Sequence, residues 1–382
     1  MSDREAQRSE LSFEEHCRIL DQIAQAGCLW LLYSGGEIFA RRDFLDIYTY
    51  AKKKGLIVTL FSNGTLVTER IADYLVQWRP FSIEITLYGR TKETYEKLTG
   101  IPGSYEKCLR GIRLLKERNL PLKLKTVAVT LNKHEIWDMK KFVEEELGLS
   151  FKFDAMMSPR IDCSQSPLAV RLKPVEVVEL DWLDPERISE WKKFQNDFGG
   201  PVHSEENSDE LYHCGGGVQS FAIDPSGKMS ICVLSHFDTY DLRTGNFQEA
   251  WESFLQEVRK KKITKLTKCV RCGIKAMCGM CPANGELENG QAELPVDFLC
   301  HVAHLRAMAI GTTVPEHGEC EYCEKGFEHQ NLKAEVESIQ KNNATRQINL
   351  QDSLQIERVI SSQSGCGSGG CSSCSLSLQS SR

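Results

Sequence analysis

Apolar and polar residues alternate along about the first 160 residues in a pattern that predicts strands and helices in turn. Apolar runs predict strands at 28–33, 56–61, 82–87, 122–129 and 151–156. Amphipathic segments predict helices at 12–26, 43–54, 67–77, 104–118 and 134–146, the first begun by a capping box of Ser12 and Glu15. The run at 28–33 is continuously apolar, as in a strand buried on both faces. A strand and a helix recur about every thirty residues, which is typical of a parallel α/β sheet or barrel.

Glycine and polar residues follow several of these strands. The first strand ends at Ser34-Gly35-Gly36-Glu37 and the second at Ser62-Asn63-Gly64-Thr65. In α/β folds the active site lies at this carboxyl edge, so the sequence predicts a small zwitterionic ligand there. Its candidate binding residues share a strand end or a strand interior: Gly35, Gly36, Glu37, Ser62, Asn63, Lys125 and Asn132. Taken singly, Gly-Gly and Asn-Gly are also ordinary turns, and Lys125 fits a solvent-facing position as well as a buried one that needs an anionic partner.

A run of cysteines further along the chain is the strongest chemical signal. Seven cysteines follow the spacing C-x12-G-x4-C and then C-x2-C-x5-C-x2-C-x18-C: Cys214, Cys232, Cys269, Cys272, Cys278, Cys281 and Cys300. Soft thiolates at such spacing suit zinc or iron–sulfur clusters, and a disulfide framework is the remaining reading. Seven ligands fit two sites better than one.

Composition narrows the classes of function. The 382 residues include 47 basic and 53 acidic ones, a formal charge of −6, which argues against a dedicated nucleic-acid or anionic-membrane surface. No apolar run has membrane-spanning length, and the first ten residues are polar and no signal peptide. Sixteen cysteines without a secretory signal predict a reducing cytoplasm and metal-binding thiols rather than disulfides.

The remaining segments complete the predicted organisation. Residues 159–213, with three prolines and an acidic run, are predicted to be a linker or a substrate-facing insertion. Segments at 220–224 and 228–233 predict a hairpin around a Pro-Ser-Gly turn, and an apolar helix is expected from residue 298 onward. A charged helix is expected within 332–360. The Ser/Gly/Cys tail, 361–382, is expected to be disordered, with solvated thiols at Cys366, Cys371 and Cys374.

These motifs resemble a known family. Residues 12–158 are similar to the partial barrel of the radical S-adenosylmethionine (SAM) enzymes, where the Gly-Gly-Glu motif, here Gly35-Gly36-Glu37, contacts the methionine amine of SAM. Residues 214–300 resemble the SPASM extension of that superfamily, although the gap between Cys278 and Cys281 is two residues rather than three. The resemblance implies 4Fe–4S clusters and SAM as cofactors. It also implies modification of a peptide or protein through a 5′-deoxyadenosyl radical, thioether formation included, with an electron donor such as flavodoxin or ferredoxin.

The resemblance also divides the chain. It implies a partial (β/α) TIM-like barrel lacking its first strand at 1–158, the insertion at 159–213, an iron–sulfur SPASM domain at 214–312, an extension at 313–360 and the tail at 361–382. The defining C-x3-C-x2-C motif of the superfamily occurs nowhere in the sequence. We expect either an N-terminal truncation, which we favour because the other SAM motifs are intact, or a non-catalytic relative. The competing function is an interaction protein with structural zinc or iron–sulfur sites. The sequence identifies no catalytic residue; Asp162 and Cys163 follow a strand end and are candidates to face the active site, although a lone cysteine is more often inert.

The ligand pattern of the family, carried onto matching positions, separates the seven cysteines into two sets. Cys269, Cys272, Cys278 and Cys300 are expected to hold one auxiliary cluster. Cys214, Cys232 and Cys281 are expected to hold a second cluster with a position left for a fourth ligand. That ligand is a substrate thiolate, a carboxylate, a histidine or an outside cysteine such as Cys320.

Overall fold

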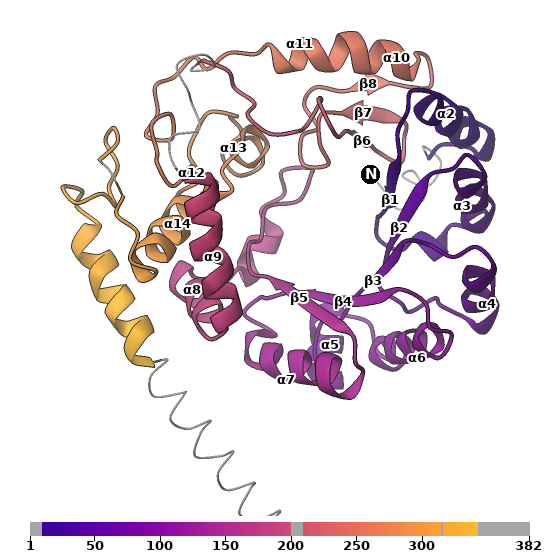
Figure 1. Cartoon of the computed structure of the whole chain (residues 1–382), viewed down its shortest axis with the longest axis horizontal. Helices are drawn as coiled ribbons and strands as arrows, with labels where there is room; N and C mark the ends of the chain where they lie inside the picture. Colours follow the sequence, from indigo (N-terminus) through magenta and orange to yellow (C-terminus); the bar gives the residue numbers. More distant parts are fainter. Residues whose placement is uncertain (1–9, 200–208, 315, 343–382) are drawn as a thin grey trace, which may run out of the picture.

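The computed structural model describes residues 10–199, 209–314 and 316–342, and its N-terminal half is a curved parallel sheet (Figure 1). The five strands lie in the order β1-β2-β3-β4-β5, each paired in parallel with the next. Their bounds are β1 Trp30–Tyr33, β2 Ile57–Ser62, β3 Ser82–Thr86, β4 Leu122–Val127 and β5 Ser150–Asp154. The predicted partial barrel is confirmed.

Helices cover the convex side of this sheet (Figure 1). They are α2 Phe13–Gln25, α3 Phe44–Lys53, α4 Glu69–Gln77, α5 Lys92–Thr99, α6 Ser104–Glu117 and α7 Ile136–Lys141, which continues as the π-helix η3 Phe142–Glu146. The capping box that begins α2 is present, with Ser12 N donating to Glu15 Oε2 at 2.7 Å and Glu15 N to Ser12 Oγ at 3.2 Å. The sequence predicted all of these helices except α5, whose side chains are mostly polar.

The two faces of the sheet differ in burial, and this corrects one expectation. Residues such as Val58, Leu60, Ile83 and Ile85 are fully buried under the helices. The opposite face lines the open centre of the ring, so Trp30 and Leu32 of β1 remain 56% and 50% exposed. The expectation that the 28–33 strand is buried on both faces is therefore wrong.

The segment between the barrel and the cysteine-rich part is more regular than expected. It forms the helices α8 Pro174–Trp182 and α9 Pro185–Phe198, each with proline in its first turn. Proline is favoured there because its missing N–H has no partner in a helix start anyway. The structure thus corrects the expectation of an irregular linker, while most of the acidic run lies outside the described residues.

The C-terminal half closes the ring beside β1 and β5 (Figure 1). The predicted hairpin is confirmed: β6 Ala222–Ile223 pairs antiparallel with β7 Lys228–Ser230, and a third strand, β8 Tyr240–Asp241, adds to it. The helices are α10 Phe247–Glu249, π-helix η6 Ala250–Phe254, α11 Leu255–Arg259, α12 Lys275–Cys278, α13 Pro282–Asn289 and α14 Asp297–Ala309. A further helix spans 329–342, and the predicted disordered tail with its three cysteines lies outside the described residues. Across the described ranges, no helix is long and apolar enough to cross a membrane.

Buried polar contacts fix the C-terminal half against the rest. Arg306 of α14 donates to Asp181 Oδ2 of α8 at 2.6 and 2.9 Å, and both residues are almost completely buried. Arg171 and Glu288 of α13 form a second, bidentate ion pair at 2.7 and 2.9 Å. On the other side, Phe247 N donates to Gln22 of α2 at 2.7 Å. The cysteine-rich part is therefore held close to both ends of the sheet.

Candidate metal and cofactor sites

Glu37 connects the ends of the first two strands. Its carboxylate accepts hydrogen bonds from Ser62 Oγ at 2.8 and 2.9 Å, from Asn63 N at 2.8 Å and from Phe39 N at 3.1 Å. Charge-assisted bonds of this kind are stronger than neutral ones, so they hold the loop after β1 against the end of β2. Glu37 thus positions the strand-end loops, and its carboxylate is already occupied by donors of this chain.

The two glycines before Glu37 remain open. Gly35 and Gly36 are exposed, and a Cβ added at either would meet no other atom within 4 Å. Gly35 has φ +152°, a backbone conformation that favours glycine, whereas Gly36 has no such constraint. Their main-chain groups are therefore accessible to a ligand at the carboxyl edge of the sheet.

Asn63 and Lys125, two further candidates, have different surroundings. Asn63 Oδ1 accepts hydrogen bonds from the amide and the hydroxyl of Thr65, which forms the turn after β2. Lys125 lies on the inner face of β4, where its Nζ binds Glu84 Oε2 at 3.0 Å and sits over the Phe61 ring. The expected anionic partner of Lys125 is thus present.

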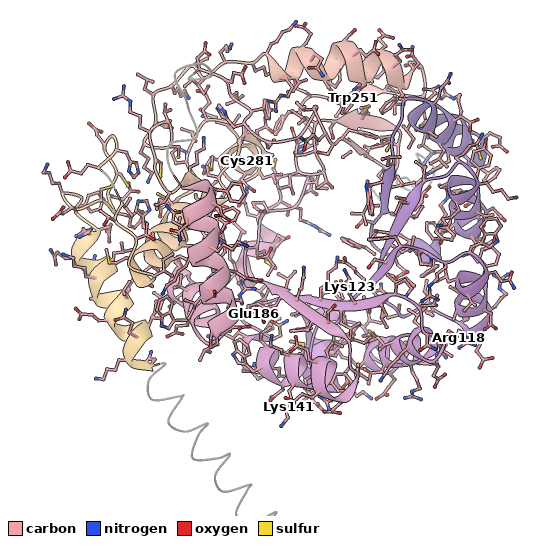
Figure 2. All side chains as sticks on the ribbon, viewed as in Figure 1. Arg118, Lys123, Lys141, Glu186, Trp251 and Cys281 are labelled. Carbon is pink, nitrogen blue, oxygen red and sulfur yellow. The ribbon has the colours of Figure 1, made fainter. Side chains whose placement is uncertain are left out.

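The inner face of the sheet around Lys125 is polar. The register pairs Glu84 with Lys123 and Lys125 with Lys152, so charged side chains share this face across three strands. Figure 2 shows Lys123 on the side of the sheet toward the centre of the ring. A face of this composition suits a polar substrate rather than a packed core.

Asn132 does not fit the role expected for it. It is completely buried, its Oδ1 accepts from Val129 N at 2.8 Å, and its Nδ2 donates to the carbonyls of Tyr88 and Val127, both at 3.0 Å. These hydrogen bonds provide partners for main-chain groups at and just beyond the ends of β3 and β4. Asn132 has a structural role, and its side chain presents no surface to a ligand.

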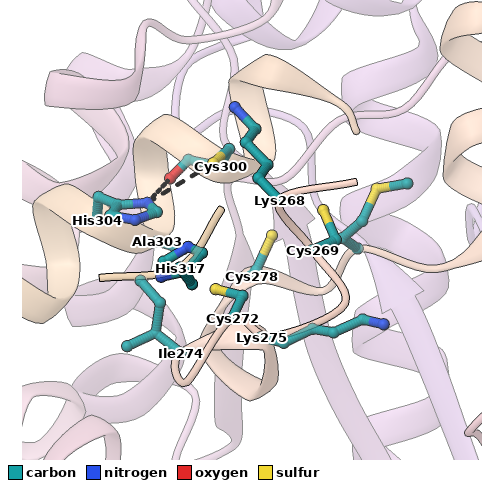
Figure 3. Close-up of a pocket in the computed structure, with 11 residues that line it drawn as sticks. Lys268, Cys269, Cys272, Ile274, Lys275, Cys278, Cys300, Ala303, His304 and His317 are labelled. Atoms are coloured by element: carbon teal, nitrogen blue, oxygen red, sulfur yellow. Dashed lines mark hydrogen bonds between the residues drawn. The ribbon is translucent and has the colours of Figure 1, made fainter. Parts of the chain in front are cut away.

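Four of the seven cysteines meet in one pocket. Cys269, Cys272, Cys278 and Cys300 line it together with Lys268 and Lys275 (Figure 3). Cys269 and Cys272 come from the loop before α12, Cys278 from the end of α12, and Cys300 from the first half of α14. These are the four residues assigned to one cluster by the family pattern.

The chemistry of this pocket fits a metal cluster. Burial raises the pKa of the Cys278 thiol to about 12 and also raises that of Cys269, so without a metal these thiols stay neutral. A bound metal deprotonates a coordinating thiol outright, and the two nearby lysines offset the resulting negative charge. The donor set therefore suits a thiolate-bound iron–sulfur cluster.

The other three cysteines form a second set. Burial is the main cause that raises the pKa of Cys281, and the neighbouring thiols of Cys232 and Cys214 add to the rise. Cys214 is exposed, whereas Cys232 and Cys281 are half-buried. Cys320, offered above as an outside ligand for this set, instead lies against Cys300 and His304.

A group of polar side chains beyond β5 surrounds Cys163, whose partners were not predicted from the sequence. Cys163, with a left-handed φ of +63°, places its Sγ 3.9 Å from His236 Nε2 and 3.8 Å from Glu286 O. Among the described residues, no hydrogen-bond partner is found for Glu286 Oε2 or His236 Nδ1. The residues come from three distant segments with no common motif, so no local sequence signal joins them.

A pH dependence follows from Glu286. Burial, with a contribution from Asp238, raises the pKa of its carboxyl to about 7. Since the ordinary value is about 4.3, the folded state binds a proton that the unfolded state releases. The stabilisation is complete below about pH 4.3 and is lost as the pH rises through 7, a difference of up to about 4 kcal/mol. We expect Glu286→Gln to raise the thermal midpoint at pH 8 and to leave it unchanged at pH 4.5. Equal midpoints of variant and wild type at pH 8 would contradict this.

A second group missed by the sequence analysis lies next to the cysteine pocket. His304, His317, Cys320 and Cys323 are all buried and bring their ligand atoms together. The spacing His317-x2-Cys320-x2-Cys323 was the available signal, but its partner His304 lies on α14, well before it in the chain.

Comparison with known proteins agrees with this arrangement. The model of the radical SAM superfamily matches residues 3–144. The chain is 33% identical over 141 residues to an AdoMet-dependent heme synthase of Methanosarcina barkeri, covering 36% of this chain and 40% of that protein. It is 25% identical over 313 residues to an AdoMet-dependent heme synthase of Oleidesulfovibrio alaskensis, covering 75% and 79%. It is 31% identical over 118 residues to a PqqA peptide cyclase of Granulibacter bethesdensis, covering 31% and 32%. The chain thus spans less than half of two of these relatives.

Solved structures share the fold. Streptococcus suis SuiB bound to S-adenosylmethionine has a TM-score of 0.58 at 15% identity, over 76% of this chain and 70% of that one. Native anSMEcpe with AdoMet and the Kp18Cys peptide has a TM-score of 0.56 at 17% identity, over 77% and 88%. Together with the family match, these likenesses support the resemblance drawn from the sequence: residues 3–144 match the radical SAM superfamily, and the chain shares its fold with SuiB and anSMEcpe.

Proposed function

We propose that this protein takes part in radical SAM-dependent modification of a peptide or protein, with two auxiliary iron–sulfur clusters in its C-terminal half. The observation that carries the proposal is the pocket of Cys269, Cys272, Cys278 and Cys300, which brings four cysteine thiols together in one buried place. Peptide-acting proteins among the relatives and structural neighbours support the substrate class.

SAM is proposed to bind at the carboxyl edge of the sheet. The open main chain of Gly35 and Gly36 offers carbonyl acceptors for an ammonium group, while Glu37, through Ser62 and Asn63, holds that loop in place. A 4Fe–4S cluster held by three thiolates would supply the electron for reductive cleavage of SAM, and this sequence has no C-x3-C-x2-C motif to hold one. An external donor of the flavodoxin or ferredoxin kind is proposed to deliver electrons.

The second cysteine set is proposed to lie nearest the substrate. Cys214, Cys232 and Cys281 supply three thiolates, and Cys214 is exposed. A substrate thiolate suits the fourth ligand position, and thioether formation suits this arrangement. That reaction would join the sulfur to a substrate carbon; the hydrogen of the carbon goes to 5′-deoxyadenosine, the proton of the thiol goes to solvent, and SAM, cleaved to methionine and 5′-deoxyadenosine, is the oxidant. The charged inner face near Lys123 and Lys125 is proposed to contact the substrate.

Gly36→Val gives a direct test of the SAM site. The added side chain meets no atom of this chain within 4 Å of its Cβ, so the fold should be retained. The side chain would fill the space that a ligand needs, and we expect at least a tenfold loss of SAM affinity by equilibrium dialysis. Lys52→Val, on the outer helix α3, is the control: it also introduces valine, but away from the proposed SAM site, and should leave SAM affinity unchanged. Unchanged SAM affinity in Gly36→Val would show that the motif is only a turn.

A second test concerns the ability of this 382-residue chain to cleave SAM. Because the sequence contains no C-x3-C-x2-C motif, we expect this 382-residue chain to form no 5′-deoxyadenosine from SAM and a reductant. Robust 5′-deoxyadenosine formation by the 382-residue chain would contradict this expectation and would show that other residues of the chain hold the cluster that cleaves SAM.

A further inference from the structure

Four buried side chains next to the cysteine pocket have the donor atoms of a metal site. His304 lies on α14, and His317, Cys320 and Cys323 lie in the segment between α14 and the helix at 329–342. One ligand atom from each lies within 4.8 Å of all the others, and each residue is at most 5% exposed. Among the described residues, this is the one group of three or more such side chains that meets so closely. We propose that it binds a structural zinc ion.

The distances fit a single tetrahedral ion. Cys320 Sγ lies 3.5 Å from His304 Nε2, and Cys323 Sγ lies 3.4 Å from His317 Nδ1. With Zn–S of about 2.3 Å and Zn–N of about 2.0–2.1 Å, a tetrahedral ion separates a sulfur and a nitrogen ligand by roughly 3.6 Å. The four atoms therefore need to move little to coordinate zinc.

The hydrogen bond of His304 selects its ligand atom. His304 Nδ1 lies 2.8 Å from the carbonyl oxygen of Cys300, one turn earlier on α14, so Nδ1 carries the proton and donates it. That leaves Nε2 unprotonated and facing Cys320. Zinc-bound histidines commonly donate their other ring nitrogen to a carbonyl in this way.

Charge and burial also favour zinc. Two thiolates and Zn²⁺ sum to zero charge, which makes a buried site tolerable, whereas two buried thiolates alone are costly. The adjacent pocket already has four cysteines of its own, so a cluster there needs no further thiolate. Because the four donor atoms of the His/Cys group meet within 4.8 Å, they suit one ion rather than a cluster, which would hold its ligands further apart.

The surrounding chain is built to present this group. Gly326 N donates to Cys323 O at 2.7 Å, and a Cβ at Gly326 would come within 2.1 Å of Glu321 O, so the turn after Cys323 requires glycine. The Tyr322 ring packs on His304 at 5.3 Å, and its hydroxyl donates to Asp297 at 3.1 Å. Zinc bound here fastens this segment onto α14 beside Cys300, and thereby covers the cysteine pocket.

The first test is the metal content of the full chain, purified anaerobically, and needs no variant. We expect about one zinc per chain in addition to iron, and zinc-edge X-ray absorption with two sulfur ligands at about 2.3 Å and two nitrogen ligands at about 2.0 Å. Absence of zinc, or a shell of four sulfurs, would overturn the proposal, since the latter places zinc in the cysteine pocket.

The second test uses Cys320→Ser/Cys323→Ser. The double variant should lose its zinc and keep its iron. When Co²⁺ is added, the wild type should show the visible absorption of a thiolate-bound tetrahedral site and the double variant should not. Cys17→Ser/Cys28→Ser, on α2 and before β1, removes two thiols elsewhere and should keep both metals. Retained zinc in the first variant, or loss of iron with it, would assign these cysteines to another role.

Discussion

Replacing Cys278 by serine should remove one iron–sulfur cluster and leave the other. Cys278 is buried and shares its pocket with Cys269, Cys272 and Cys300, so the variant removes one of four thiolates from that set. A serine hydroxyl is a poor ligand for iron in place of a soft thiolate. We expect the loss of about four irons per chain, half of the iron in two 4Fe–4S clusters, measured by iron and labile-sulfide analysis after anaerobic reconstitution.

A buried cysteine outside the pocket provides the matched control. Cys108 on α6 is completely buried, so Cys108→Ser also introduces a buried hydroxyl. This variant should keep all the iron. Cys281→Ser should remove the other cluster. The electron paramagnetic resonance signal that it abolishes should differ from the signal that Cys278→Ser abolishes. If Cys281→Ser and Cys278→Ser abolish the same signal, the division into two sets is wrong.

Replacing Asp181 by alanine should destabilise the protein by about 3–5 kcal/mol, because it leaves a buried guanidinium without its partner. Asp181 is 2% exposed and accepts from Arg306 at 2.6 Å and from Arg187 at 2.6 Å. Arg306 is 3% exposed and packs over the Trp191 ring, so water has little access to its charge. The change is measured as the shift in the anaerobic unfolding transition.

Two further variants separate charge loss from general damage to α8 and α9. Asp181→Ala/Arg306→Met also removes the buried guanidinium and should recover part of the loss, since the remaining partner, Arg187, is partly exposed to water. Glu190→Ala, at an exposed position of α9, should stay within about 0.5 kcal/mol of wild type. A loss below 1 kcal/mol for Asp181→Ala would show that the pair does not hold the two halves together.

The strand and helix pattern was predictable because each element carries its own local signal. The capping box of Ser12 and Glu15 and the strand-end motifs marked element boundaries directly. The exposure of Trp30 and Leu32 was not predictable, because an apolar run does not reveal that one face lines an open ring. The sequence did not predict the helices α8 and α9. Pro174 and Pro185, which begin them, are equally typical of a linker.

The candidate site was predictable to the extent that its ligands lie close in sequence. The spacing of Cys269, Cys272 and Cys278, with Cys300, identified a set that the fold brings into one pocket. Asn132 was predicted to bind the cofactor because it follows the end of a strand. Its side-chain amide instead forms hydrogen bonds with the main chain of Val129 and Tyr88. His304 meets Cys320 only through the return of the chain after α14, so no local motif contained that pair.

The most direct test of the central claim is the iron, sulfide and zinc content of the chain purified without oxygen, together with its colour and Mössbauer spectrum. We expect brown protein with about eight irons and as much labile sulfide, in two four-iron clusters, and about one zinc. Colourless protein without sulfide, in which zinc fills the seven-cysteine sites, would rule out the two clusters and favour an interaction protein with structural zinc.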